Sequence, residues 1–193
     1  MSNYLIPLMV VVPMLCAILV NAFAKFNKSI KVLTFVVAIC LPIIPLLSNY
    51  GLHFFGGYTP MLDNATGVIY HPAITYAFDM LQQIFIVAVG LITFLVAFIY
   101  LSKYKKASGQ YLFLLFMGTA SVTALMLTDD IFNMFVFFEI LALVQVGIVI
   151  ASPMDDSYEM ALKSMILGSI GSPIMLLGIG FLLASTGNIN ISD

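Results

Sequence analysis

Six long apolar stretches constrain the fold of this chain more than any other feature of its sequence. They cover residues 4–24, 30–48, 74–101, 110–127, 131–150 and 158–184. Each stretch, coiled as a helix at 1.5 Å per residue, is long enough to cross about 30 Å of hydrocarbon. Only 8% of the 193 residues are charged and 62% are hydrophobic, so the chain cannot cover itself with polar surface in water. The sequence therefore predicts one all-α membrane domain over residues 1–193 with six transmembrane helices.

The lysines predict how these helices are oriented. Six of the seven flank the first and third connections, as Lys25, Lys28, Lys31, Lys103, Lys105 and Lys106. Positively charged connections stay on the cytoplasmic side, so both are predicted to face the cytoplasm. The connections at 49–73 and 128–130 carry no lysine and are predicted to lie outside. Six crossings of the cell membrane, the inner membrane in a two-membrane cell, then place both termini outside.

Glu139 is the one charged residue in the apolar stretch Ile131–Ile150. It lies about 14 Å along the helix from Asp130 and about 17 Å from Ile150, which is close to the midplane. An acidic residue there costs on the order of 3 kcal/mol on insertion scales, and intramembrane acids are functional by default. Burial favours the neutral acid and a nearby cation favours the carboxylate, so together they can make the proton exchangeable. We predict that Glu139 transfers protons. The alternative is a protonated Glu139 that only hydrogen-bonds a neighbouring helix.

Lys163 lies outside both lysine clusters, about two turns into the sixth stretch. One interpretation makes it a proton-relay base that is coupled electrostatically to Glu139. The other interpretation is a lysine that extends to the membrane surface and pairs with Glu159, four residues earlier in the favourable Glu-then-Lys order. Spacing alone leaves both open.

Two candidate accessory groups of a proton path, Asp79 and His71, lie near the predicted outer side. Asp79 is equally well interpreted as an interfacial acid in the first turn of a helix, near the positive end of its dipole. His71 lies with His53 and Asp63 in the connection at 49–73, where Gly, Pro, Asn and Asp predict a loop with turns. No metal-ligand spacing is present, so exposed loop residues are the favoured interpretation and no metal is predicted.

Several classes of function are disfavoured. All seven basic residues are lysines and the net charge is −2, which argues against nucleic-acid binding. Cys16 and Cys40 lie in apolar runs with no CxxC motif, so a metal or cluster is not expected. The sequence holds no Ser/His/Asp arrangement and no phosphate-binding glycine loop. The chain is therefore not expected to be catalytic alone or to hold a cofactor.

Four segments resemble one family of membrane proteins. They are DIFNMFVFFEILAL at 130–143, ALKSMILGSIGSPIMLLGIGFLLASTGNINISD at 161–193, HFFGGYTP at 53–60, and the FD of ITYAFDML. Together they resemble the antiporter-like subunits of Mrp-type cation/proton antiporters, membrane-bound hydrogenases and respiratory complex I. The outer-loop segment is most similar to the Mrp D-type and hydrogenase branch, although Tyr58 stands where that branch has Trp.

The resemblance implies a role in proton transport or Na⁺/H⁺ antiport within a multisubunit complex. It implies that Glu139 is the family's fifth-helix glutamate, which works with lysines to move protons. Lys163 matches the sixth-helix lysine of one branch, although Ser164 stands where the family often has Tyr. Family members continue into a broken seventh helix that supplies a key lysine, and this chain stops before it. We therefore expect a truncated or split form whose remaining helices come from another membrane subunit.

Two other functions remain open from the sequence. The first is a scaffold subunit that joins the modules of such a complex and carries no ions. The second is an independent small transporter that acts as a dimer. Such carriers often contain internal repeats, and residues 1–90 and 91–193 show no convincing repeat.

Overall fold

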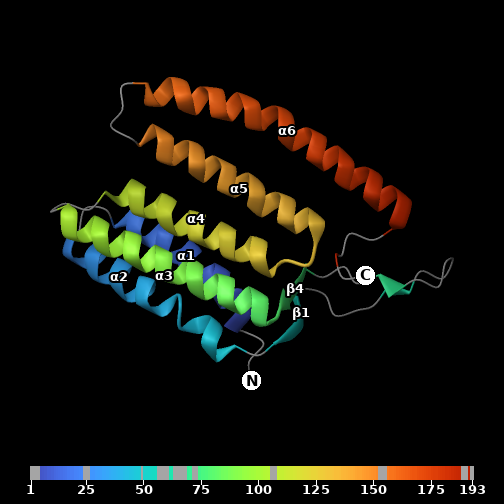
Figure 1. The fold of residues 1–193 in the computed structure, drawn as a ribbon, viewed down its shortest axis with the longest axis horizontal. Coiled ribbons are helices and arrows are strands. Elements are labelled where there is room, and N and C mark those ends of the chain that lie inside the picture. Colours follow the sequence, from blue (N-terminus) through green and yellow to red (C-terminus); the bar gives the residue numbers. More distant parts are fainter. Residues whose placement is uncertain are drawn as a thin grey trace.

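The structure is a computed structural model that describes residues 5–23, 27–48, 50–55, 61–62, 69–70, 74–104, 108–151, 156–187 and 191. Within these residues, six α-helices run side by side in alternating directions (Figure 1). They are α1 (Leu5–Ala22), α2 (Asn27–Cys40), α3 (Met80–Lys103), α4 (Gly109–Leu127), α5 (Ile131–Ile150) and α6 (Ser157–Thr186). Five of them, all except α2, are long and apolar enough to cross a membrane. The all-α membrane fold is confirmed, and the chain is a multi-pass membrane protein.

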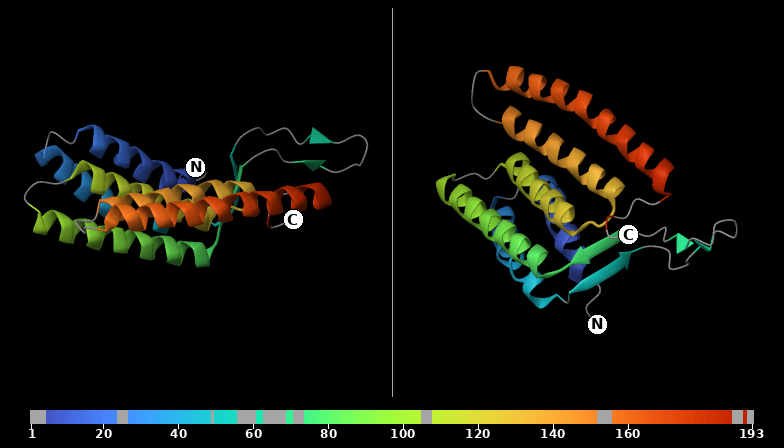
Figure 2. Two further views of the ribbon diagram at one scale, coloured as in Figure 1. Left: turned by 90° about the horizontal axis from the view of Figure 1, so that it is seen from above. Right: turned by 45° about the vertical axis from the view of Figure 1, so that its right-hand side comes forward.

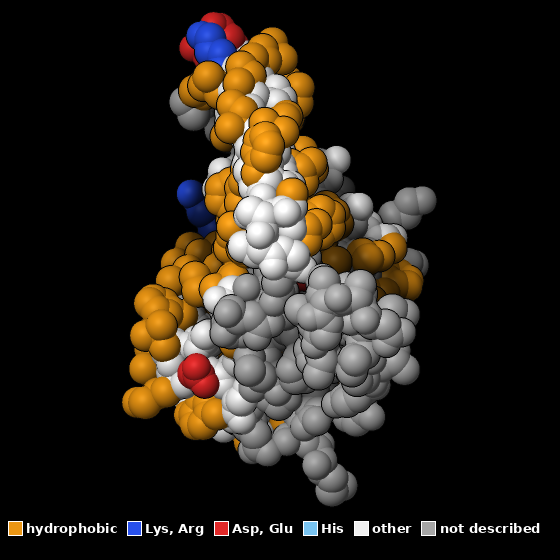
Figure 3. Space-filling view, turned by 90° about the vertical axis from the view of Figure 1, so that its right-hand side faces the viewer, with side chains coloured by type: hydrophobic (Ala, Val, Ile, Leu, Met, Phe, Trp, Pro, Cys, Tyr) orange, Lys and Arg blue, Asp and Glu red, His pale blue; other side chains and the backbone are white. Residues whose placement is uncertain are grey.

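Helix α4 lies at the centre of the packing. It contacts α1, α3 and α5, while α2 packs on α3 and α1. Helix α6 packs on α5 at the edge of the bundle, and its buried residues are limited to Ser157, Ala161 and Ile179. Much of its remaining surface is hydrophobic, as the ridge at the top of Figure 3 shows. An apolar, uncovered helix of 30 residues is stable in lipid or against another protein, and not in water.

The second predicted helix, 30–48, needs a correction. Helix α2 ends at Cys40, and a turn at Leu41–Ile43 leads into the 3₁₀ helix η1 (Ile44–Leu47). The break falls at Pro42, which has no N–H to donate, and Pro45 follows inside η1. Because α2 rises about 21 Å and η1 about 8 Å, the two together still reach nearly the thickness of the hydrocarbon layer.

Helix α3 passes close to this break. A Cβ atom added to Gly90 would lie 2.8 Å from the backbone nitrogen of Pro42 and 3.1 Å from the carbonyl carbon of Leu41. The close approach of α3 to this break therefore depends on glycine at position 90, because a side chain there would collide with main-chain atoms and force α2 and α3 apart.

The third predicted helix, 74–101, begins later than expected, and part of the predicted loop is a β-hairpin. Residues 74–78 form strand β4 (Ile74–Phe78), which pairs antiparallel with β1 (Gly51–Phe55), from Gly51 opposite Phe78 to Phe55 opposite Ile74. Two short strands, β2 (Met61–Leu62) and β3 (Ile69–Tyr70), pair with each other. β-Branched and aromatic residues favour the extended conformation of β4, and Asp79 then caps the start of α3.

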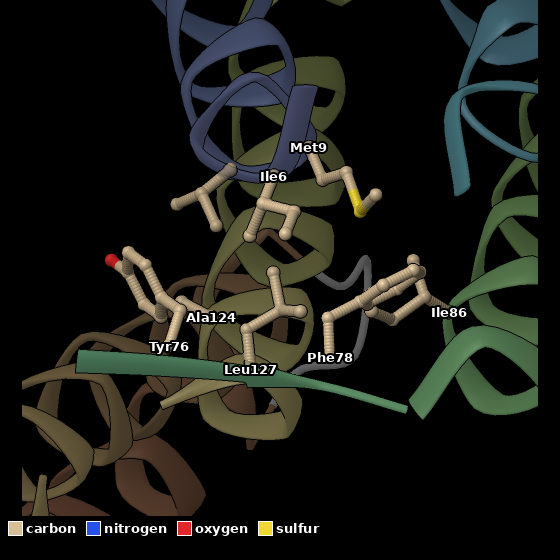
Figure 4. Packing of buried hydrophobic residues seen from close by; sticks show 8 residues of the cluster. Ile6, Met9, Tyr76, Phe78, Ile86, Ala124 and Leu127 are labelled. Carbon is tan, nitrogen blue, oxygen red and sulfur yellow. The ribbon is translucent and has the colours of Figure 1, made fainter. Parts of the chain in front are cut away.

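The hairpin closes one end of the helix bundle. Tyr76 and Phe78 of β4 pack against Ile6 and Met9 of α1, Ile86 of α3, and Ala124 and Leu127 of α4 (Figure 4). We call this the hairpin end, and it also holds the α4–α5 turn, the start of α1 and the end of α6 (Figures 1 and 2). A second buried cluster, around Cys16, Leu112 and Phe116, joins α1, α2 and α4 nearer the opposite end.

The opposite end of the bundle, where α1, α3 and α5 finish, carries Lys28, Lys31 and Lys103, and we call it the lysine end. Lys31 Nζ donates to the carbonyl oxygens of Leu101, at 3.5 Å, and Tyr104, at 3.1 Å, and so closes the C-terminus of α3. The described lysines of both clusters thus lie at one end of the helices. That this end faces the cytoplasm remains a prediction.

Candidate functional site

Helix α5 spans Ile131–Ile150, as predicted, and places Glu139 close to its middle. The carboxyl-bearing residue lies roughly 12 Å from the first residue of the helix and roughly 17 Å from the last. Its side chain is half-buried. Among the described residues, Glu139 has no hydrogen bond or ion pair.

Glu139 faces away from the packed core. Phe137 packs against the buried cluster at the hairpin end. Val144 is buried against α4, where its Cγ1 atom lies 3.2 Å from the position that a Cβ atom on Gly118 would take. At 100° per residue, both lie about 140–160° around α5 from Glu139. The carboxyl group therefore points toward the side of α5 that α4 does not cover.

Lys163 is paired with Glu159 in the structure. The Nζ and Oε1 atoms are 2.6 Å apart, and the two side chains are 69% and 64% exposed. No ion pair joins Lys163 to Glu139 among the described residues, and the two lie at levels that differ by roughly 8 Å along the helices. The structure thus shows the surface pairing that the sequence offered as one interpretation. A relay role for Lys163 remains a prediction.

Two substitutions separate these interpretations. Glu159→Gln removes only an exposed ion pair, which is expected to cost no more than about 0.5 kcal/mol of stability and to leave ion transport unchanged. Lys163→Gln breaks the same pair, and if Lys163 relays protons it also lowers the transport rate. Ion flux into vesicles containing the assembled complex measures the difference. Equal, normal flux in both variants would reduce Lys163 to a surface residue.

Asp79 lies at the start of α3, where it is exposed. Its side chain accepts from the backbone N–H of Gln82, while its own backbone N–H donates to Oε1 of Gln82 at 3.0 Å. This reciprocal cap is the geometry of an interfacial acid that stabilises a helix. A role for Asp79 on an ion path remains a prediction, and His71 lies outside the described residues.

A polar cluster at the hairpin end fixes the start of α5, and the sequence did not predict it. Asp130 Oδ1 accepts from the backbone N–H groups of Phe132, at 2.7 Å, and Asn133, at 3.1 Å. Asn133 Nδ2 donates to Thr128 Oγ1 at 2.9 Å, and its side chain also hydrogen-bonds Tyr76 of β4. Burial raises the pKa of Tyr76, and the bond to Asn133 opposes that rise in pKa. The cluster anchors α5 six residues before Glu139 and so sets the depth of the carboxyl group.

Among the residues that the structure describes, no group of three or more His, Cys, Asp or Glu side chains could hold a metal ion. The site therefore consists of one half-buried carboxyl group, a surface-paired lysine and an anchored helix start. In this arrangement the carboxyl group forms no hydrogen bond or ion pair with a described residue.

Comparison with known proteins identifies related sequences. Residues 128–193, which include α5 and α6 with Glu139 and Lys163, match the model of the NADH:quinone oxidoreductase/Mrp antiporter transmembrane family. An uncharacterized protein of Methanocaldococcus jannaschii is 40% identical over 191 residues, covering 99% of this chain and 38% of that protein. A Na⁺/H⁺ antiporter subunit of Bacillus subtilis is 30% identical over 105 residues, covering 54% of this chain and 21% of that protein.

Solved structures share the fold. A chain of the membrane-bound sulfane sulfur reductase, an archaeal respiratory membrane complex, superimposes with a TM-score of 0.78 at 23% identity, covering 98% of this chain and 39% of that one. A chain of the Mrp complex from Dietzia sp. superimposes with a TM-score of 0.79 at 21% identity, covering 97% of this chain and 35% of that one. In each case the 193 residues span less than half of the relative. The family match over residues 128–193 and the shared fold together support placing this chain among the antiporter-like membrane subunits.

Proposed function

We propose that this chain is part of an ion-translocating subunit that carries protons, or exchanges Na⁺ for H⁺, within a multisubunit membrane complex of respiratory, hydrogenase or Mrp type. The observation that carries the proposal is the position of Glu139. It stands mid-span on α5, inside the segment that matches the family model, and faces away from the core. A carboxyl group that served only packing would be expected to hydrogen-bond a neighbouring helix, and none of the described residues bonds to it.

The proposed mechanism is a cycle of protonation and deprotonation at Glu139. A charged lysine nearby holds the carboxyl group ionised, because opposite charges favour each other in a medium of low polarity. When that lysine moves away or loses its proton, burial favours the neutral acid, and Glu139 takes up a proton through water. Lys163 is one candidate for this lysine, and a lysine outside the described residues is the other. A conformational or redox event elsewhere in the complex drives the switch.

Other membrane subunits are the proposed partners. The names of the solved relatives describe multisubunit complexes, and the surfaces of α5 and α6 are left open by this chain. A Cβ atom placed on Gly168, Gly171, Gly178 or Gly180 of α6 would meet no atom within 4 Å. Small residues of this kind allow close approach between membrane helices. Further helices of the antiporter-like fold, the seventh among them, would cover this face and complete the surroundings of Glu139.

The proposed location is the cytoplasmic membrane, with the lysine end inside and the N-terminus outside. This orientation rests on the positive-inside rule and on the collection of the described lysines of both clusters at one end.

The test of the proposal is ion transport by the assembled complex with and without the carboxyl group of Glu139. Vesicles are loaded with a pH-sensitive dye, and the complex is energised by its redox substrate or by an imposed ion gradient. Transport that depends on Glu139 supports the proposal. Undiminished transport without the carboxyl group would favour the scaffold role.

A further inference from the structure

A cavity of about 670 Å³ opens at the lysine end, between the end of α3, the start of α4 and the end of α5. Both α3 and α5 pack on α4, but they make few contacts with each other, so a space remains between them at this level. The cavity lies beside α4 and on the far side of α3 from the contact between α3 and Lys31. It is separate from Glu139, which lies about 14 Å deeper along α5 than Ile148, a residue that lines the cavity.

The mouth of this cavity is polar and carries the positive charge of Lys103. Lys103, Ser108 and Gln110 line it together with three tyrosines. Lys103 Nζ lies 5.7 Å from the ring centroid of Tyr104, and among the described residues it makes no ion pair. Lys31 is different, because its ammonium group already bonds to the carbonyl oxygens at the end of α3. No carboxylate lines the cavity to neutralise Lys103 among the described residues, so its ammonium group can attract an anion.

The three tyrosines form an aromatic wall at the same level. The Tyr100 ring is 4.3 Å from that of Tyr111 and 4.9 Å from that of Tyr104, measured between centroids. The Tyr100 hydroxyl accepts from the backbone N–H of Ser108 at 2.9 Å, which ties the wall to the start of α4. Tyrosine side chains are enriched at the boundary between headgroups and hydrocarbon. A wall of three tyrosines is therefore suited to the level of the lipid headgroups.

The deeper wall of the cavity is apolar. Val96 and Ile99 stand on the same face of α3 as Lys103, seven and four residues earlier, and Ile148 faces them from α5. The apolar wall therefore begins below Lys103 and extends about 10 Å toward the membrane interior. A ligand that fills both parts must be anionic at the surface and hydrocarbon below.

We propose that this cavity binds an anionic phospholipid, with its phosphate group at Lys103 and its upper acyl chain along Val96, Ile99 and Ile148. The charge at the mouth matches a phosphate, the tyrosine wall matches the headgroup level, and the apolar wall matches the start of the acyl chains. A free phosphate would use only the mouth. The lipid would fill the space between α3 and α5 and hold the two helices at a fixed separation.

Native mass spectrometry of the purified complex, after removal and controlled return of lipid, tests this site. Phosphatidylglycerol and phosphatidylcholine are added to the wild type, to Lys103→Gln and to Lys28→Gln. Lys28 is the matched control, because it is exposed at the same end and does not line the cavity. We expect one phosphatidylglycerol to bind more tightly than phosphatidylcholine, and Lys103→Gln to weaken it about fivefold while Lys28→Gln changes it less than about twofold.

Other outcomes would overturn the proposal. Equal losses in the two variants, or no preference for phosphatidylglycerol in the wild type, would remove the specific role of Lys103. Competition by inorganic phosphate as effective as by phosphatidylglycerol would assign the mouth to a free anion. A photo-crosslinking residue at Gln110 that reacts only with another membrane subunit, and never with lipid, would show that protein fills the cavity.

Discussion

Glu139→Gln is expected to abolish ion transport by the complex while leaving its assembly intact. Glutamine has nearly the same shape and helix propensity as glutamate, so α5 is expected to keep its structure. It cannot bind and release a proton near neutral pH, and it removes an acidic group whose insertion costs on the order of 3 kcal/mol. Assembly is therefore expected to be preserved or slightly improved. Ion flux in vesicles, normalised to the amount of complex, measures the effect.

Glu159→Gln provides the matched control for this experiment. It makes the same chemical change on an exposed side chain whose loss costs little stability. We expect its transport rate to equal that of the wild type. Transport at the wild-type rate by Glu139→Gln, in a complex of normal composition, would remove the proton-transfer role and leave a structural one.

Gly90→Ala is expected to destabilise the chain by about 1–3 kcal/mol, the usual cost of overpacking a tight contact. The new methyl group would stand 2.8 Å from the backbone nitrogen of Pro42 and 3.0 Å from its Cα. Both belong to the turn between α2 and η1, so the clash can be relieved only by moving α2 and α3 apart. Thermal unfolding of the purified chain in detergent measures the loss as a lower midpoint.

Gly168→Ala on α6 is the control for Gly90→Ala. A Cβ at Gly168 would meet no atom within 4 Å, and alanine favours a helix over glycine by up to about 1 kcal/mol. The same substitution is therefore expected to leave the midpoint unchanged or to raise it slightly. Equal midpoints for Gly90→Ala and Gly168→Ala would contradict the close approach of α3 to the break at Pro42.

The sequence predicts the later helices well because local signals mark their ends. Asp130 caps the start of α5, and the run to Ile150 is apolar except for Asn133, Glu139 and Gln145. The end of α6 coincides with Gly187, whose φ of 72° suits a residue without a Cβ atom. Pro13 and Pro173 stand inside α1 and α6, as expected for membrane helices whose neighbours can donate hydrogen bonds to the freed carbonyl groups.

The predicted end of α2 was wrong because membrane helices tolerate proline. Prolines occur inside helices and at their ends in this chain, so Pro42 does not by itself predict a break. The hairpin was missed because its pairing is not local, with Gly51 opposite Phe78. A strand of five residues that pairs with one more than twenty residues away is set by tertiary contacts, here the packing of Phe78 under α1 and α4.

Sequence alone predicted part of the candidate site and missed the rest. Glu139 is found from sequence because a charge in an apolar helix is costly and stands out. The pairing of Lys163 with Glu159 was one of two interpretations, and spacing could not choose between them. The role of Asn133 was missed because Tyr76, one of its partners, is brought to α5 only by the hairpin.

Infrared difference spectroscopy of the working complex tests the central claim most directly. A protonated carboxylic acid in a dry environment has a carbonyl stretching band that disappears when the proton leaves. We predict that such a band rises and falls with turnover in the wild type and in Glu159→Gln, and that it is missing from Glu139→Gln. A band that persists in Glu139→Gln, or a wild-type spectrum in which no carboxyl group changes its protonation, would contradict the proposal that Glu139 carries the proton.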